Sequence, residues 1–413
     1  MPSGLRGPSC CAAAATARTA TRTDPRAGAP PARASPRRPI GSRVTAALIV
    51  RDEERFLAGC LASLAGRVDE IVVADTGSVD RTRGIAREHG ARLIEHRWTD
   101  DFAAARNAAL DAASGDWILY IDADERLAAW DRAGLEPLLT DPRVVACTVL
   151  FRPQTGFTRY REHRLFRNRG DLRFRGVIHE SILPAIHEAC AREGAHVARS
   201  AAALDHLGYD GDLSAKHRRN RPLLEVRLAA EPDHVYSRDH LGLTLLGMGD
   251  EAGAEAAWRR AIGSLRSRPS HAPSEASDAL PFLHLASFLL DRKRDARAVL
   301  DEARERFPED HALAWLDARE RLEAGDPAAA LPLFSALARV DAGSLCMPRA
   351  YDASIFGANA HAAAGLCAFR LGRYGESAGH YARAEALAPD RMEFRLKRQL
   401  AEARGSNGQC SSA

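Results

Sequence analysis

The first part of the chain alternates short apolar segments with segments of helical periodicity, and this alternation restricts the fold more than any other feature. Apolar runs of strand length lie at residues 44–50, 70–74 and 117–121. Helical periodicity lies at residues 53–65, 80–89 and 102–113. Further strands are expected at residues 92–96, 148–151 and 171–178. Strands that alternate with helices predict an α/β domain with a mixed, mostly parallel sheet.

After about residue 205 the strand pattern stops, and the sequence is typical of paired helices. One pattern of small residues flanking a large apolar or aromatic residue recurs there four times. The copies are Gly249/Ala254/Trp258/Ala261, Ala296/Leu300/Ala303/Pro308, Gly325/Ala330/Phe334 and Gly365/Gly372/Tyr381/Ala384/Pro389. Leu300 and Phe334 are 34 residues apart, which is the period of tetratricopeptide (TPR) repeats. The pattern therefore favours an all-α, TPR-like repeat domain over a helical bundle without repeats.

These patterns divide the chain into five parts. Residues 1–42 are rich in Ala, Arg, Pro, Ser and Thr and have too few large apolar residues to offset the entropy of ordering, so a disordered tail is expected. It is interpreted as a loose tail or an early start codon, with docking to an acidic surface as the alternative. The α/β domain then spans 43–210, a linker helix 211–235, the repeats 236–400, and a second disordered tail 401–413.

Charge and cysteine content exclude several classes of protein. Eight arginines and one acid fall within residues 1–43, so the remainder of this +3 chain is mildly acidic and nucleic-acid binding is not expected. No apolar run approaches the roughly 18–20 residues of a transmembrane helix, and no signal peptide is expected. The eight cysteines form no CxxC pair, which is typical of a cytoplasmic protein with reduced thiols.

Acidic side chains follow two of the predicted strands at the point where each strand ends. Asp75 comes after one apolar run, and Asp122 and Asp124 come after another. Ligands of open parallel sheets bind beyond the carboxyl ends of the strands. Residues i and i+2 of an extended chain point the same way, so both carboxylates of the pair suit a hard divalent cation such as Mg²⁺ or Mn²⁺. Asp75 is predicted to accept hydrogen bonds from a base or ribose, and Asp80 to cap the following helix.

Taken together, four segments of residues 44–125 resemble the family 2 glycosyltransferases of the GT-A fold. The segments read RDEE, DEIVVADTGSVDRT, DDFAAARNAAL and GDWILYIDADE in that order. Weaker similarity continues through His163-Arg164-Leu165-Phe166, then through residues 174–180, and ends near the segment that contains His206. Asp52 stands where many relatives have asparagine, which leaves its expected contact with the nucleotide in doubt.

The resemblance implies an inverting, hexosyltransferase-type enzyme that uses a nucleotide-diphospho-sugar, with uridine the commonest base in this family. The acceptor is a saccharide, a lipid-linked saccharide or a polypeptide, and the repeats are a candidate surface for a protein partner. The implied donor-binding residues are Val50, Asp52, Glu53, Asp75, Gly77, Arg106, Asp122 and Asp124. The implied ligands of an Mg²⁺ or Mn²⁺ ion are Asp124, Asp122 and His206.

Inverting transfer requires a base that takes a proton from the acceptor nucleophile. Glu180 is the candidate, and His179 beside it is expected to orient it or to bind phosphate. The alternative for Glu180 is a structural ion pair with a nearby arginine. Arg106 and Arg164 either contact phosphate or pair with carboxylates, and His206 is either a ligand or a packed histidine.

Two other functions are alternatives to an active glycosyltransferase. The first is a TPR protein-interaction module whose nucleotide-sugar-binding domain is catalytically inactive. The presence of Asp75, Asp122, Asp124 and Glu180 argues against this function. The second is a nucleotidyltransferase, which is expected to carry a glycine-rich loop with basic residues after the first strand. Residues 52–54 at that position are all acidic.

Overall fold

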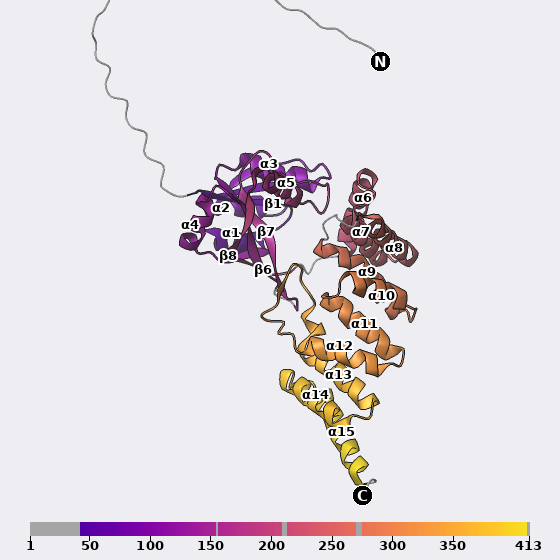
Figure 1. Ribbon diagram of the computed structural model, residues 1–413. Helices are drawn as coiled ribbons and strands as arrows, with labels where there is room; N and C mark the ends of the chain where they lie inside the picture. Colours follow the sequence, from indigo (N-terminus) through magenta and orange to yellow (C-terminus); the bar gives the residue numbers. More distant parts are fainter. Residues whose placement is uncertain (1–41, 154–155, 209–212, 270–274, 411–413) are drawn as a thin grey trace, which may run out of the picture. The chain divides into compact units, whose positions relative to one another are not determined.

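The computed structural model describes residues 42–153, 156–208, 213–269 and 275–410. The predicted tail at 1–42 therefore lies outside the described residues except for Ser42. In the first part of the described chain, strands and helices alternate as the sequence predicts (Figure 1). Its elements are β1 (Val44–Val50), α1 (Leu57–Leu64), β2 (Glu70–Asp75), α2 (Thr82–Glu88), β3 (Arg92–Glu95), α3 (Phe102–Ala112), β4 (Trp117–Tyr120), β5 (Glu125–Ala129), α4 (Arg132–Thr140), β6 (Val144–Pro153), β7 (Arg159–Arg167), α5 (Leu183–Glu193) and β8 (His196–His206).

These strands form one mixed sheet in the order β3-β2-β1-β4-β7-β6-β8-β5. The half that contains β1 to β4 is parallel, with β1 between β2 and β4. The register pairs Val50 with Asp75 and Ala47 with Tyr120, so the carboxyl ends of these strands lie at the same edge. Beyond β4 the sheet continues through antiparallel pairing with β7. The prediction of a mixed, mostly parallel α/β sheet is confirmed.

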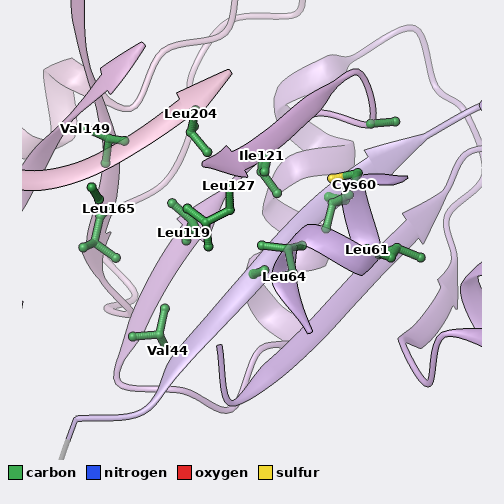
Figure 2. Packing of buried hydrophobic residues seen from close by; sticks show 14 of the residues in the cluster. Val44, Cys60, Leu61, Leu64, Leu119, Ile121, Leu127, Val149, Leu165 and Leu204 are labelled. Carbon is green, nitrogen blue, oxygen red and sulfur yellow. The ribbon is translucent and has the colours of Figure 1, made fainter. Parts of the chain in front are cut away.

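Each face of the sheet is covered by its own apolar cluster, because successive residues of a strand point to opposite faces. Val44 and Leu48 of β1 pack with α1, α2 and α4. Ala47 of the same strand packs on the other face with α3 and α5. Figure 2 shows the first cluster, in which Leu61 and Leu64 of α1 lie among strand residues. Both faces are thus buried, which explains the continuous apolar runs in the sequence.

The predicted strand at residues 171–178 is wrong, and the strand that follows β6 is β7. Residues 171–178 form an irregular loop, with one isolated bridge between Arg175 and Ser181. The amide side chain of Asn107 replaces a strand partner there: its Nδ2 donates to the Phe174 carbonyl at 3.0 Å, and its Oδ1 accepts from the Phe174 amide at 2.9 Å. Phe174 is therefore buried without being part of the sheet.

From residue 213 on, the described chain is mainly helical, and consecutive helices pair as TPR-like repeats do (Figure 1). The helices are α6 (Leu213–Ala230), α7 (Val235–Gly247), α8 (Glu251–Ser267), α9 (Leu280–Asp291), α10 (Arg297–Arg306), α11 (His311–Glu323), α12 (Pro327–Ala338), α13 (Gly357–Arg370), α14 (Tyr374–Leu387) and α15 (Met392–Cys410). The large residue of each repeat copy is buried; these are Trp258, Leu300, Phe334 and Tyr381. A Cβ on Gly242 would lie 2.4 Å from the Trp258 indole nitrogen, so a small residue is required at this crossing.

The repeat region differs from prediction at two places. The sequence predicts a disordered tail at 401–413, but residues 401–410 continue α15, whose Ala401 is buried. The insertion between α12 and α13 contributes a short strand, β9 (Cys346–Met347), that pairs in parallel with β7. Close to it, the backbone amide of Tyr351 donates to the Thr158 hydroxyl at 2.9 Å. Helical periodicity gave no signal for this pairing, because its two partners are far apart in sequence.

Candidate active site

The loops that follow β1 and β2 are held together by hydrogen bonds between their backbones and side chains. The Asp52 amide donates to the Ser78 hydroxyl at 2.9 Å, and the Val79 amide donates to the Asp52 carboxylate at 2.8 Å. The Glu53 amide donates to the Thr82 hydroxyl at 2.7 Å. Asp52 has a φ of 55°, a conformation that aspartate tolerates better than most residues. Its carboxylate shapes the loop, and its contact with a nucleotide stays a prediction.

Asp75 lies at the base of these loops, with its side chain buried. Its carboxylate accepts hydrogen bonds from the amides of Gly77 and Ser78 and from the Arg83 side chain at 2.6 Å. Burial acts to raise the pKa of Asp75, but the hydrogen bonds outweigh it and the pKa is lowered. Gly77 has a φ of 112°, which only glycine adopts without strain. The carboxylate of Asp80 accepts from the amide of Thr82, the first residue of α2, but the N-cap position is Arg81 and no side chain caps the helix, so Asp80 is not the predicted cap.

Asp122 is held by two arginines. The Arg106 guanidinium on α3 lies 3.0 Å from one carboxylate oxygen, and the Arg164 guanidinium on β7 lies 3.5 Å from the other. The Tyr120 ring contacts both guanidinium groups, with its centroid 5.2 Å and 4.4 Å from their central carbons. Burial acts to raise the pKa of Asp122, but the two positive charges lower it to about 2. Asp122 therefore carries a full negative charge at neutral pH.

Arg164 and Glu125 are central to this network, although Glu125 was not among the predicted site residues. Both side chains are almost fully buried, and they form an ion pair at 2.9 Å. Glu125 also accepts a hydrogen bond from the Asp122 backbone amide at 3.0 Å, and Arg164 pairs with Glu162 at 2.5 Å. Burial raises the pKa of Glu125 against the opposing charge of Arg164. Of the two roles open for Arg164, the structure shows the carboxylate pair.

Asp124 and His206 are brought together by the pairing of β5 with β8, in which Glu125 lies opposite His206. The carboxylate of Asp124 is 3.1 Å from Nε2 of His206. The hydrogen bond that His206 donates to the Asp124 carboxylate raises the pKa of His206 against the effect of burial. Burial first, and then the charges of Asp124 and Asp122, raise the pKa of Glu53 to about 7. Negative charge is thus concentrated where the loops after β1 and β4 meet.

A divalent cation fits Asp124 and His206 better than it fits all three predicted ligands. Adjacent ligands of an octahedral ion at about 2.1 Å lie about 3 Å apart, close to the separation of the Asp124 and His206 atoms. Asp122 is engaged by Arg106 and Arg164 instead. Over the described ranges, no three His, Cys, Asp or Glu side chains are grouped to hold a metal ion. A two-residue donor set leaves positions for phosphate oxygens and water, as is usual for Mg²⁺.

Glu180 forms an ion pair with Arg106, whose Nε lies 2.5 Å from its carboxylate. Arg106 therefore links Glu180 to Asp122 across the loop after β4. Both groups of the Glu180–Arg106 pair are largely buried, at 11% and 12% side-chain exposure. The ion pair was the alternative for Glu180 at the sequence level, whereas its role as a base stays a prediction.

His179 contacts α7. Its ring centroid lies 4.1 Å from that of His240 and 5.1 Å from that of Tyr236. The Arg227 guanidinium donates to its backbone carbonyl at 2.8 Å, and its φ is 51°. Burial and nearby positive groups lower the pKa of His179 to about 2, so it offers no positive charge to a phosphate at neutral pH. Its predicted action on Glu180 or phosphate stays a prediction.

Mild acid is expected to destabilise the protein through His179 and His240. Burial is the largest cause of their low pKa values, about 2 and about 4. The unfolded chain takes up protons below about pH 6.5 while these folded side chains do not, so stability falls as pH falls. Each histidine should lower the free energy of unfolding by about 1 kcal/mol between pH 6.5 and 5.5. The ionisable groups facing the pair are His234, Arg227, Lys216, His284 and Asp239.

Differential scanning calorimetry at pH 5.5 and 6.5 measures this effect. The melting temperature of a His240→Phe variant should depend less on pH than that of the wild type, because the phenylalanine keeps the ring contact with His179 and removes one titrating group. Equal pH dependence in the two proteins would contradict the assignment.

The family comparison agrees with this geometry. Residues 45–191 match the model described as Glycosyl transferase family 2. A TPR repeat-containing protein of Synechococcus elongatus is 40% identical over 63% of this chain and 64% of its own length. The SPbeta prophage-derived glycosyltransferase SunS of Bacillus subtilis is 26% identical over 46% of each chain. The matches thus span less than two thirds of the length of the first relative and less than half of the length of the second.

More distant similarity extends to other glycosyltransferases and to solved structures. The lipopolysaccharide core biosynthesis glycosyltransferase LpsC of Rhizobium meliloti is 32% identical over 37% of this chain and 61% of its own length. Glucosyl-3-phosphoglycerate synthase from Mycobacterium tuberculosis, solved with phosphoglyceric acid, is 20% identical, with a TM-score of 0.33 over 46% of this chain and 80% of that one.

Along the described parts of the chain, no helix combines the length and apolar character needed to cross a membrane. The family match covers β1 to α5, which position Asp75, Asp122, Asp124 and Glu180. Residues 45–191 are therefore similar to the family 2 glycosyltransferases, and TPR-like helical repeats follow them in the same chain.

Proposed function

We propose that this chain is an inverting glycosyltransferase that takes its sugar from a nucleotide-diphospho-sugar, with a UDP-sugar as the first choice. The observation that carries the proposal is the pairing of Asp124 with His206 at 3.1 Å, beside Asp122 and Glu53 at the carboxyl edge of the sheet. Ligands of open α/β sheets bind at this edge. The family match of residues 45–191 supports the same reaction class.

Mg²⁺ or Mn²⁺ held by Asp124 and His206 would neutralise the diphosphate leaving group. Side chains of this protein bind the nucleotide and take up the proton. The ordered loops after β1 and β2, tied by Asp52 and Asp75, present a fixed surface to the nucleotide. Arg106 holds Glu180 in place, and Glu180 takes the proton from the acceptor as it attacks.

The acceptor is proposed to be a saccharide, a lipid-linked saccharide or a polypeptide, possibilities that rest on analogy. One relative, LpsC, is named for lipopolysaccharide core biosynthesis. The helical repeats are a candidate surface for holding a protein acceptor or partner, because stacked helix pairs form extended binding surfaces. We place the reaction in the cytoplasm, where nucleotide sugars are available as donors and where the free cysteines stay reduced.

Replacing Glu180 with glutamine is expected to slow the reaction without weakening donor binding. Glutamine keeps the size of the side chain but cannot accept the proton, and a lost general base lowers rates by about 100- to 10,000-fold. The measurement combines calorimetric affinity for the nucleotide with the rate of nucleotide release from UDP-glucose, GDP-glucose and dTDP-glucose.

The matched control is Glu188→Gln, because Glu188 forms an equally short pair with Arg175 at 2.6 Å on the exposed side of α5. It should leave the rate unchanged. If Glu180→Gln also reacts at the wild-type rate, Glu180 is only a structural partner of Arg106. If it loses donor affinity instead, the residue belongs to the donor site.

A further inference from the structure

The loop of residues 176–180, which carries Glu180, contains no helix or strand. Two of its residues have positive φ values, which are 100° for Gly176 and 51° for His179. Glycine adopts such values freely, whereas histidine adopts them only where the surrounding structure offsets the cost in free energy. The contacts that hold this loop from outside therefore decide where the Glu180 carboxylate lies.

Arg227 of α6 donates hydrogen bonds to the backbone of this loop. Its Nη1 donates to the carbonyl of Ile178 and, at 2.8 Å, to the carbonyl of His179. The same guanidinium packs on Gly176, where an added Cβ would lie 2.2 Å from Nη1. Its Nη2 lies 3.0 Å from Nε2 of His234, the residue that caps α7. Arg227 therefore contacts the loop at both of its positive-φ residues.

The charge of Arg227 is buried, and the loop supplies its main partners. The Arg227 side chain is 7% exposed. Its ion pair with Glu231 is long, at 3.9 Å, and the Glu231 side chain is 52% exposed. A buried charge is costly unless hydrogen bonds satisfy it, and hydrogen bonds from a charged donor are stronger than neutral ones. The two loop carbonyls meet this need, so the arginine and the loop hold one another in place.

Helices α6 and α7 also pack against the side chains of the loop. Ile178 is buried in one apolar cluster with Leu223 and Leu224 of α6. The ring centroid of His179 lies 4.1 Å from that of His240 on α7. The helical region thus holds both the backbone and the side chains of residues 176–179.

Glu180 follows these contacts directly and is held from its other side by α3. Its carboxylate lies 2.5 Å from Nε of Arg106. The carbonyl of His179 and the backbone nitrogen of Glu180 belong to one planar peptide unit, so holding the carbonyl also fixes the start of Glu180. A misplacement of about 1 Å can lower the rate of a catalysed reaction by about 100-fold.

We propose that Arg227 is a positioning residue for sugar transfer, which acts through the carbonyls of Ile178 and His179 to hold Glu180 where it takes up the acceptor proton. The proposal rests on the proposed function, in which Glu180 is the base. It makes α6, which the sequence predicts as a linker helix, part of the framework that supports the site.

Replacing Arg227 with methionine in the full chain tests the proposal, because methionine keeps the apolar stem and removes the donors. With Mn²⁺ and whichever of UDP-glucose, GDP-glucose and dTDP-glucose the wild type consumes, kcat for nucleotide release should fall at least tenfold. Calorimetric affinity for the nucleotide should stay within about twofold. Arg227→Lys should recover most of the rate, because an ammonium group can donate to both carbonyls.

The matched control is Arg238→Met on α7. Arg238 is also 7% exposed and donates to a backbone carbonyl, that of Pro232, but not to the loop of Glu180. This variant should keep the wild-type kcat. Amide hydrogen exchange should quicken at residues 176–182 in Arg227→Met and stay unchanged there in Arg238→Met.

The Glu180→Gln background shows whether Arg227 acts through Glu180. Residues that act through one group are not additive, so Arg227→Met should slow Glu180→Gln by no more than about twofold. A wild-type kcat in Arg227→Met, or an equal slowing with and without Glu180→Gln, would overturn this proposal alone. A wild-type rate in Glu180→Gln by itself would contradict the base of the proposed function, and this proposal with it.

Gly176→Ala tests the same contact from the loop side if Arg227→Met fails to fold. The added Cβ displaces the Arg227 guanidinium and should lower kcat at least tenfold. The control Gly194→Ala also places a side chain at a positive φ, of 64°, but its Cβ meets no described atom within 4 Å. It should keep the wild-type rate, and equal rates in the two alanine variants would count against the proposal.

Discussion

Replacing Asp124 with asparagine is expected to lower cation-dependent donor hydrolysis and sugar transfer by about 1000-fold or more. Asparagine keeps the size of the side chain but removes the negative charge that faces His206 at 3.1 Å. A catalytic cation stabilises the charge on a leaving group by several kcal/mol, and each 1.4 kcal/mol is tenfold in rate. The assay measures nucleotide release from UDP-glucose, GDP-glucose and dTDP-glucose with Mn²⁺, at enzyme concentrations high enough to detect a thousandth of the wild-type rate.

The matched control is Asp205→Asn, one residue before His206. Asp205 pairs with Arg152 at 2.7 Å, and both side chains are partly exposed, so its carboxylate is outside the candidate cation site. The control should keep the wild-type rate to within a factor of two or so, since surface pairs contribute little. Wild-type activity in Asp124→Asn would remove this residue from the site.

Replacing Arg164 with methionine is expected to destabilise the protein by about 3 kcal/mol. Arg164 and Glu125 are 7% and 2% exposed, and removing Arg164 forces the buried Glu125 either to stay charged without a partner or to take up a proton, both of which cost stability at pH 7. Arg164 also contacts Asp122 and the Tyr120 ring, so the loss extends to the floor of the site. Differential scanning calorimetry should show a clearly lower melting temperature at pH 7.

Two further variants separate this effect from lost packing. Arg164→Met/Glu125→Gln should recover part of the stability, because the glutamine carries no charge that needs a partner. Arg152→Met breaks the partly exposed pair with Asp205 and should lower stability by at most about 1 kcal/mol. Equal losses for Arg164→Met and Arg152→Met would show that the buried network is unimportant for folding.

The parallel half of the sheet was predictable because burial on both faces produces continuous apolar runs. Strand β7 was not predictable in this way, because most of its residues are charged. They include Arg164, which is buried because it pairs with Glu125 and not because it is apolar. At residues 171–178 the sequence predicts a strand that the structure does not contain. Their alternating pattern reflects the burial of Phe174, while the Asn107 side chain satisfies the backbone that a strand partner would satisfy. When a side chain takes the place of a neighbouring strand as the hydrogen-bond partner, the sequence shows no periodic pattern that reveals it.

The position of the candidate site was predictable from the sequence, but the partner that each of its side chains contacts was not. Asp75, Asp122 and Asp124 lie at the strand ends where the sequence places them. Asp122 pairs with two arginines, whereas Asp124 pairs with His206. The choice of partner depends on contacts between strands that are distant in sequence. His179 was grouped with Glu180 because they are adjacent in sequence. Its ring contacts lie on α7, which the repeat pattern alone could not place beside it.

Calorimetric titration of the wild type with UDP, GDP and dTDP, each with and without Mn²⁺, measures whether Asp124 and His206 form a cation-assisted donor site. One nucleotide should bind at least about tenfold more tightly with Mn²⁺, a gain of about 1.4 kcal/mol. His206→Ala should lose this gain, because it removes one of the two side chains that hold the cation. If no nucleotide binds to folded protein, or if Mn²⁺ tightens binding equally in wild type and His206→Ala, the proposed cation-assisted donor site is contradicted.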